Sequence, residues 1–194
     1  MLYLKDNLTD RERMARDEMI YIFNPVLKLI LAHSNPYEFE KYGFNSCRQT
    51  AIFGTAILSE LLPEYNFRLY EGQFAELSNG QMITYTHAFT IGQYQDRMLL
   101  IDISRVSKRL LFHQIEDTLY PYEDEWKNVS LISKEELSLA EMLAPDVAEY
   151  FTHKSPMSVL LSIKMLMEEL KEASEEHRIQ FSDKMYAKYT QLRR

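Results

Sequence analysis

The chain has 194 residues, of which 46% are hydrophobic and 12% aromatic, enough apolar material for a sizeable core in one domain. With only 5 Gly and 6 Pro, long disordered linkers are not expected. The net charge of −7 and the pI of about 5.3 argue against nucleic-acid binding, because no basic stripe accompanies them.

Cys47 is the only cysteine, so no intramolecular disulfide can form and a reducing compartment is favoured. The histidines other than His87 lack metal-binding spacing, and we therefore expect neither a metal nor a cofactor. The first residues are quickly charged, and no apolar stretch reaches the roughly 18 residues of a membrane span. We expect a cytoplasmic protein; export as an effector without a cleaved signal is left open.

Two helices are predicted at the N-terminus. Thr9-Asp10-Arg11-Glu12 is a capping box, which predicts a helix that ends near Phe23. Asn24-Pro25 then predicts the N-cap and the first residue of a second helix. A turn at Asn35-Pro36 leads toward the cysteine.

An amphipathic helix is predicted to begin at Cys47. Asn45 or Ser46 can cap it, and Pro63 ends its apolar run, which comprises Ile52, Ala56, Leu58, Leu61 and Leu62. The free N–H groups and the dipole of a helix N-terminus lower the pKa of a thiol, which suits a nucleophile. A buried cysteine that acts as a small hydrophobe is the alternative interpretation.

Three antiparallel strands are predicted to follow the cysteine helix. The first covers residues 66–77 and turns at Ser78-Asn79-Gly80 into a second strand, Gln81 to Gly92. The segment Gln93-Tyr94-Gln95-Asp96 is a hairpin loop into a third strand, Arg97 to Ile103.

The predicted hairpin brings His87 and Asp102 together. If it is centred between residues 94 and 95, the two side chains lie directly opposite each other, with Cβ atoms about 5 Å apart. A carboxylate can then hold one imidazole nitrogen and leave the other for a thiol. A core histidine and a strand-end turn residue are the alternative interpretations.

The C-terminal half is predicted to be mainly helical. Residues 127–132 suggest a fourth strand, Ser133-Lys134-Glu135-Glu136 a second capping box that opens a helix, and Ala144-Pro145 another short helix. Ser155-Pro156 begins a long amphipathic helix, and a charged helix then runs to about Leu192.

These helices allow two interpretations. They either pack on the sheet, or their Met-rich face (Met157, Met165 and Met167) forms a homodimer or a partner-binding arm. We predict a catalytic core at residues 1–150 and a C-terminal helical extension, packed on that core, at residues 151–194.

The order helix-Cys47, strand-His87, strand-Asp102 resembles the transglutaminase-like superfamily of papain-related enzymes, which includes transglutaminases, proteases, deamidases and peptide N-glycanases. The similar span is roughly residues 43–105. His87-Ala88-Phe89 resembles the family's His-Ala-Trp, and Leu100-Ile101-Asp102 resembles its apolar-apolar-Asp ending. Arg48 follows the cysteine directly, as in a subset of the family.

The resemblance implies an α+β fold with a papain-like or transglutaminase-like core, in which N-terminal helices and the cysteine helix pack on an antiparallel sheet. It also implies a catalytic triad of Cys47, His87 and Asp102. Residues 40–44 contain no glutamine, which in papain-like enzymes supplies the second oxyanion donor. Tyr42, Asn45 or Gln73 is the candidate for that role here.

Two functions are therefore considered. The first is a cysteine peptidase, amidase or transglutaminase-like acyltransferase with a protein or peptide substrate; hydrolysis is preferred because it needs no second specific site. The second is a catalytically inactive module that binds a protein partner. An acyltransferase with a small thioester donor is a weaker third interpretation.

Overall fold

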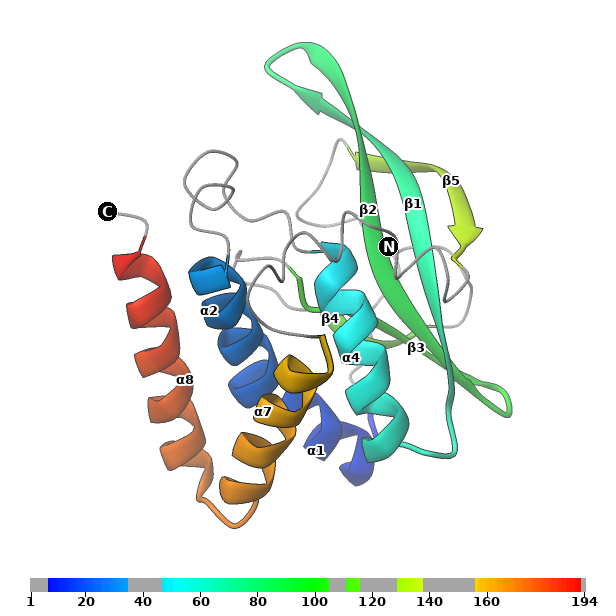
Figure 1. The fold of residues 1–194 in the computed structure, drawn as a ribbon. Coiled ribbons are helices and arrows are strands. Elements are labelled where there is room, and N and C mark those ends of the chain that lie inside the picture. Colours follow the sequence, from blue (N-terminus) through cyan, green and yellow to red (C-terminus); the bar gives the residue numbers. More distant parts are fainter. Residues whose placement is uncertain (1–6, 35–46, 105–110, 116–128, 138–155, 193–194) are drawn as a thin grey trace.

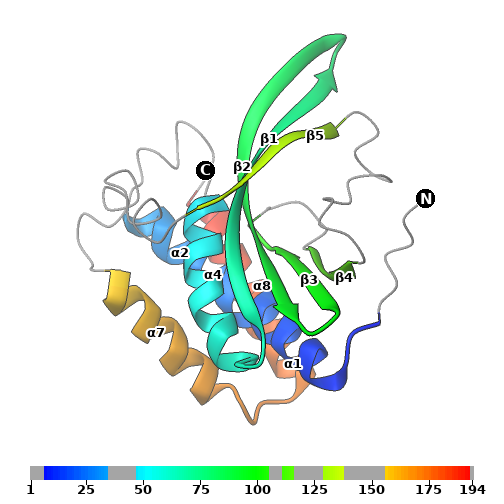
Figure 2. The same cartoon turned by 90° about the vertical axis from the view of Figure 1, so that its right-hand side faces the viewer.

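The computed structural model describes residues 7–34, 47–104, 111–115, 129–137 and 156–192. In these ranges the fold is α+β, as predicted (Figure 1). A five-stranded antiparallel sheet has the order β4-β3-β2-β1-β5, with β4 (Leu111–Ile115) at one edge, and helices are gathered on one side of it. Helix α4 (Cys47–Leu61) lies between the sheet and the other helices (Figure 2) and packs on β1 (Asn66–Ser78) and β2 (Gln81–Tyr94).

The N-terminal helix is continuous, contrary to the predicted break at Asn24-Pro25. The capping box of Thr9 and Glu12 opens α1 (Asp10–Glu18), a π-helical stretch η1 (Met19–Phe23) follows, and α2 (Asn24–Ser34) completes it. Asn24 has helical dihedral angles and is therefore not an N-cap. The wider π turn carries the helix past Pro25, whose ring and missing N–H would otherwise end it.

The hairpin between β2 and β3 (Arg97–Asp102) turns at Gln95 and Asp96 alone, where a four-residue loop was predicted. Gln95 adopts φ +53°, which this tight turn requires. Tyr94 pairs with Arg97 and Thr90 with Ile101, so the hairpin is centred between residues 95 and 96. The predicted register was therefore wrong by one position on each strand.

The predicted helix at Ser133 is instead part of strand β5 (Val129–Glu136), which pairs with β1. Ser133 pairs with Gln73 beside a bulge in this ladder. The sheet thus overrides a local capping pattern, because backbone pairing with a long neighbouring strand satisfies more polar groups than one cap. The short helix predicted at Ala144-Pro145 lies outside the described residues.

The C-terminal helices α7 (Pro156–Glu169) and α8 (Glu175–Gln191) pack mainly on α2 and η1. Val159, Ile163 and Met167 of α7 are buried in the core that the N-terminal helices share. Met157 and Met165 are exposed, so the methionines do not form one common face. A homodimer through these helices, and the domain boundary after residue 150, stay predictions.

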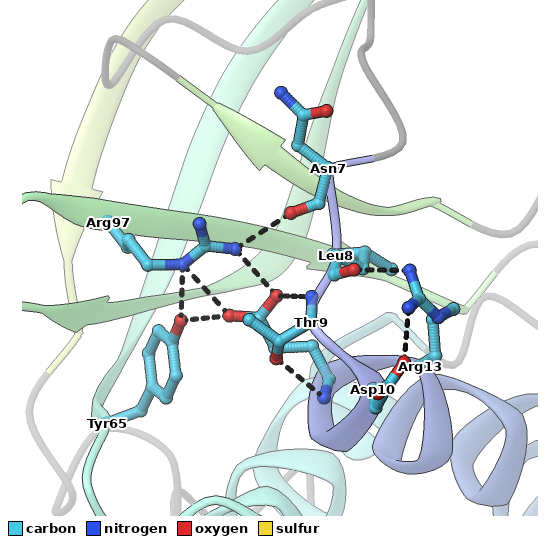
Figure 3. A network of polar contacts seen from close by, with 8 residues as sticks. Asn7, Leu8, Thr9, Asp10, Arg13, Tyr65 and Arg97 are labelled. Carbon is cyan, nitrogen blue, oxygen red and sulfur yellow. Dashed lines mark hydrogen bonds and ion pairs between the residues drawn. The ribbon is translucent and has the colours of Figure 1, made fainter.

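A network of polar contacts joins the start of the first helix at Thr9 to Tyr65 and Arg97 (Figure 3). Its centre is the buried carboxylate of Glu12. One of its oxygens accepts hydrogen bonds from the Tyr65 hydroxyl and, at 3.1 Å, from Arg97 Nε. The other accepts from an Arg97 terminal nitrogen and from the Thr9 backbone N–H, both at 2.7 Å. Burial raises the pKa of Glu12, but the hydrogen bonds from Arg97 and Tyr65 outweigh it and hold that pKa below its usual value.

Glu12→Ala is expected to lower the free energy of unfolding by about 3 kcal/mol, because it leaves Arg97 and Tyr65 without their buried partner. Tyr65→Phe, which removes the hydrogen bond to Glu12 and a longer one of 3.4 Å from Arg97 Nε, should cost about 1 kcal/mol. Since the folded pKa of Glu12 is lowered, its contribution is present above about pH 4.5 and is lost as the pH falls through the folded value. Urea unfolding of both variants at pH 4 and pH 7 measures these losses of stability. A loss in Glu12→Ala that is as large at pH 4 as at pH 7 would contradict the contribution of the ionised carboxylate.

Candidate active site

Cys47 is the first residue of α4, where the backbone N–H groups have no partner within the helix. Its side chain is buried, with 7% exposed, and packs against Leu69 of β1 and Ala88 of β2. The backbone N–H of Ala88 donates a hydrogen bond to the thiol sulfur. The pairing of β2 with β3 ends at Thr90 and Ile101, two residues from Ala88 along β2. Cys47 therefore approaches the sheet where these two strands separate.

His87 and Asp102 form a buried pair. His87 Nε2 lies 2.7 Å from Asp102 Oδ2, and the two side chains are 7% and 1% exposed. The observed register makes them diagonal rather than directly opposite neighbours, because position 102 faces position 89 when the ladder is extended. Diagonal residues still share a face, so the predicted meeting of the two groups survives the shift in register.

Cys47, His87 and Asp102 form one hydrogen-bonded chain, since the imidazole also makes a side-chain hydrogen bond with the thiol. Because Asp102 occupies Nε2, the ring offers Nδ1 to the sulfur. The other oxygen of Asp102, Oδ1, accepts a hydrogen bond of 2.9 Å from the Ser104 hydroxyl. The carboxylate is thereby fixed on both sides and holds the ring in a single orientation.

The pKa shifts of the thiol and the imidazole run in opposite directions. Burial raises the pKa of Cys47, but the hydrogen bond and the positive charge of His87 outweigh burial. The net pKa of Cys47 is therefore below its ordinary value. Burial lowers the pKa of His87, but the charge and the hydrogen bond of Asp102 raise it to about 9. These shifts favour a thiolate–imidazolium pair at neutral pH.

The imidazole is also held from the side by an aromatic ring. Phe74 of β1 stands edge-on to His87, with ring centroids 6.0 Å apart at 65°. Gly72, the residue paired with His87 on β1, makes room for it: a Cβ there would lie 2.8 Å from the Phe74 ring and from Leu131. Neither Gly72 nor Phe74 was marked by the sequence, which shows only an alternating strand.

Two further buried residues lie next to the hydrogen-bonded side chains of Cys47, His87 and Asp102, and sequence reasoning missed them. Ser104, on the segment after β3, bonds to Asp102 as described. Lys28 of α2 is fully buried, and its ammonium donates a hydrogen bond to the Ser104 carbonyl. The signal in the sequence was a lysine among the apolar residues Val26, Leu27, Leu29, Ile30 and Leu31.

Of the three predicted oxyanion donors, Gln73 alone lies within the described residues. Tyr42 and Asn45 lie outside the described residues. Gln73 is exposed on β1, on the strand face of Glu71 and opposite Thr86. Arg48 forms an ion pair with Glu71, with two contacts of 2.7 Å, beside the nucleophile. The backbone N–H of Cys47 is the donor that the described helix start supplies.

Two cavities differ in their relation to this site. One of about 10 Å³, close to the volume that holds a single water, lies between α4 and the separating strands and is lined by Cys47, Thr50, Asp102 and Ser104. One of about 350 Å³ lies among α1, α4 and α7, and no residue of the Cys47 centre lines it. Within the described ranges, no group of three or more His, Cys, Asp and Glu side chains is arranged to hold a metal ion.

Comparisons with known proteins found no matching family model, no similar curated protein and no similar solved structure. The resemblance to the transglutaminase-like superfamily therefore rests on the order, spacing and local structure of Cys47, His87 and Asp102. In the part of the chain that the structure describes, no helix is long and apolar enough to cross a membrane.

Proposed function

We propose that this chain is a cysteine enzyme of acyl transfer, with Cys47 as nucleophile, His87 as general base and acid, and Asp102 as the group that orients His87. The observation that carries the proposal is the buried hydrogen-bonded chain of these three side chains at a helix N-terminus. A thiol with a lowered pKa beside an imidazole with a raised pKa is the electrostatic arrangement that such chemistry requires.

The proposed reaction begins with attack of the Cys47 thiolate on an amide carbonyl carbon. A carbon–sulfur bond forms, and the Cys47 N–H donates to the developing oxyanion. The His87 imidazolium then gives its proton to the leaving amine as the carbon–nitrogen bond breaks, which leaves a thioester on the enzyme. His87, now neutral, takes a proton from water, which attacks the thioester and releases the carboxylic acid and the thiol.

We prefer hydrolysis, as a peptidase or amidase, to transamidation, because an amine acceptor would need a second specific site. The substrate class proposed is a protein or peptide amide. A papain-like or transglutaminase-like core is the fold to which this proposal corresponds, and the α+β arrangement of α4 against an antiparallel sheet supports it. A cytoplasmic location agrees with a single cysteine that must stay reduced.

The alternative, a catalytically inactive module that binds a protein partner, has one observation in its favour. Cys47 is 7% exposed and His87 5% exposed, so a substrate carbonyl has little direct access to the sulfur in this conformation. An intact and electrostatically matched chain of three groups favours the enzyme, since a binding module has no need to retain it.

Trapping of the acyl-enzyme tests the proposal. The purified chain is incubated with a library of peptide amides and then with hydroxylamine, which converts a thioester to a hydroxamate. We expect a covalent adduct on Cys47 by intact mass and peptide mapping, and hydroxamate release. Cys47→Ala should give neither, and Cys47→Ser should at most give an ester that accumulates slowly. Modification that persists in Cys47→Ala would sink the assignment of the nucleophile.

A further inference from the structure

Lys28 is a buried charge next to the Cys47 centre that the proposed reaction does not use. It lies in the middle of α2, 0% exposed, and its ammonium donates to the Ser104 carbonyl. The hydroxyl of the same serine donates to Asp102, so Lys28 is connected to the Cys47 centre through one residue. From most positions on a helix, a lysine side chain can extend its ammonium to water. A completely buried ammonium loses that hydration, which is costly unless a nearby negative charge compensates the loss.

The negative charges that act on Lys28 are those of Asp102 and Cys47, and both stabilise its protonated form. Burial nevertheless has the larger effect and lowers the pKa of Lys28 to about 8. Lys28 is therefore protonated in neutral solution. By reciprocity, its positive charge stabilises the Asp102 carboxylate and the Cys47 thiolate to the same degree.

Helix α8, which packs on α2, places two tyrosines along the row of α2 that carries Lys28. Asn24, Lys28 and Ala32 follow one another at helical spacing along α2. Tyr186 of α8 accepts a hydrogen bond from the Asn24 amide, and its pKa is raised to about 12, chiefly by burial. Tyr189 of α8 packs against Ala32. Tyr186 is thus uncharged wherever Lys28 titrates.

We propose that Lys28 is a positioning residue of the Cys47 centre, whose buried ammonium, held on the Ser104 carbonyl, balances Asp102 so that the thiolate–imidazolium pair forms without net charge. This inference rests on the proposed function. With Lys28 the centre holds two positive and two negative charges; without it, a buried centre would carry an uncompensated negative charge, which opposes ionisation of the thiol.

The first test is the pH profile of Cys47 alkylation by iodoacetamide in Lys28→Met and Lys28→Gln. The acidic limb of the profile is the rise in rate as the Cys47 thiolate forms, at a pH where Lys28 is protonated. Its midpoint should move up by about 1 pH unit in the variants, so that alkylation on this limb is about tenfold slower. The alkaline limb should move less, because Lys28 has already lost most of its charge near pH 9. Lys164→Met, which removes one charge from the outer ion pair with Glu60, is the control and should leave both limbs unchanged.

The second test needs no substitution. The titration of the Lys28 side chain is followed by NMR of ¹³C-labelled lysine, before and after Cys47 is blocked with iodoacetamide. We expect the Lys28 midpoint to fall by about 1 pH unit, because a neutral thioether replaces the thiolate. This measurement decides the matter if both Lys28 variants fail to fold.

The outcomes separate the two proposals. If Cys47 of the unsubstituted chain shows no reactivity below neutral pH, the proposed function fails. If that reactivity is present but folded Lys28 variants keep the same acidic limb, or the Lys28 midpoint does not move when Cys47 is blocked, only the role of Lys28 is overturned. A parallel fall of both limbs in amplitude, without displacement along the pH axis, would show that Lys28 is merely structural.

Discussion

Replacing His87 with alanine is expected to slow alkylation of Cys47 by iodoacetamide about 100-fold at pH 6. The imidazole lowers the pKa of the thiol against the effect of burial, through its hydrogen bond and its positive charge. Without it, burial keeps the pKa of Cys47 above the ordinary value of a thiol, about 8.5, so at most about 0.3% is thiolate at pH 6. Since only the thiolate reacts, the rate falls with that fraction.

The matched control for this variant is His177→Ala, which removes an exposed histidine at the start of α8. Its alkylation profile should coincide with that of the unsubstituted chain. Both chains should also react at the same rate in denaturant, where Cys47 is a free thiol. If His87→Ala keeps its rate at pH 6 while folded, His87 does not activate Cys47, and the binding module becomes the better interpretation.

The candidate site could be predicted to the extent that it depends on which residues share a face of the sheet, because this follows from the two-residue alternation along a strand. His87 and Asp102 share a face in any hairpin register that differs from the true one by a whole position on each strand, so their meeting did not depend on the precise turn. The turn itself was misjudged. Gln95 adopts a left-handed conformation that its side chain does not favour, and local turn chemistry gave no sign of it.

The contacts of Lys28 were beyond sequence reasoning. Lys28 and Ser104 are separated by 76 residues, and no periodicity joins a helix lysine to a carbonyl after a strand. The strand at Ser133 and the π turn before Pro25 show the same limit, because in both places packing against a partner overrode a strong local signal. Local patterns indicate elements, whereas pairing and burial decide which of two compatible elements forms.

Asp102→Asn is expected to reduce acyl-enzyme formation by a factor on the order of 10⁴, the size of effect known for such a change in a serine triad. The carboxylate raises the pKa of His87 to about 9 against the effect of burial. With a neutral amide, both contributions of Asp102 are lost, so the pKa of His87 falls and less of the imidazole is protonated at pH 7. An asparagine Nδ2 can also donate to Nε2, which would leave a proton on Nδ1, the nitrogen that must accept one from the thiol.

The same substitution changes how stability depends on pH, which gives a readout that does not require a substrate. A raised folded pKa means that the contribution of His87 to stability is fully present below about pH 6.5 and is lost as the pH rises through about 9. Lys28, whose folded pKa is lowered, acts in the opposite sense between about 8 and its ordinary value of 10.5. Cys47, whose folded pKa is also lowered, acts in that opposite sense at neutral pH and would cancel the slope of His87. The window from pH 6.5 to 8 is therefore informative for His87 in a chain in which Cys47 is replaced by alanine.

Urea unfolding across that window should show stability falling with pH in Cys47→Ala, and little change with pH when Asp102→Asn is added to it. Ser104→Ala is the control, because it removes one hydrogen bond to the carboxylate but leaves its charge. It should keep the slope and most of the acyl-enzyme formation. If Asp102→Asn retains both the slope and the rate, the charge of Asp102 does not hold the proton on His87, and the hydrogen-bonded chain is a structural feature of the core rather than a catalytic one.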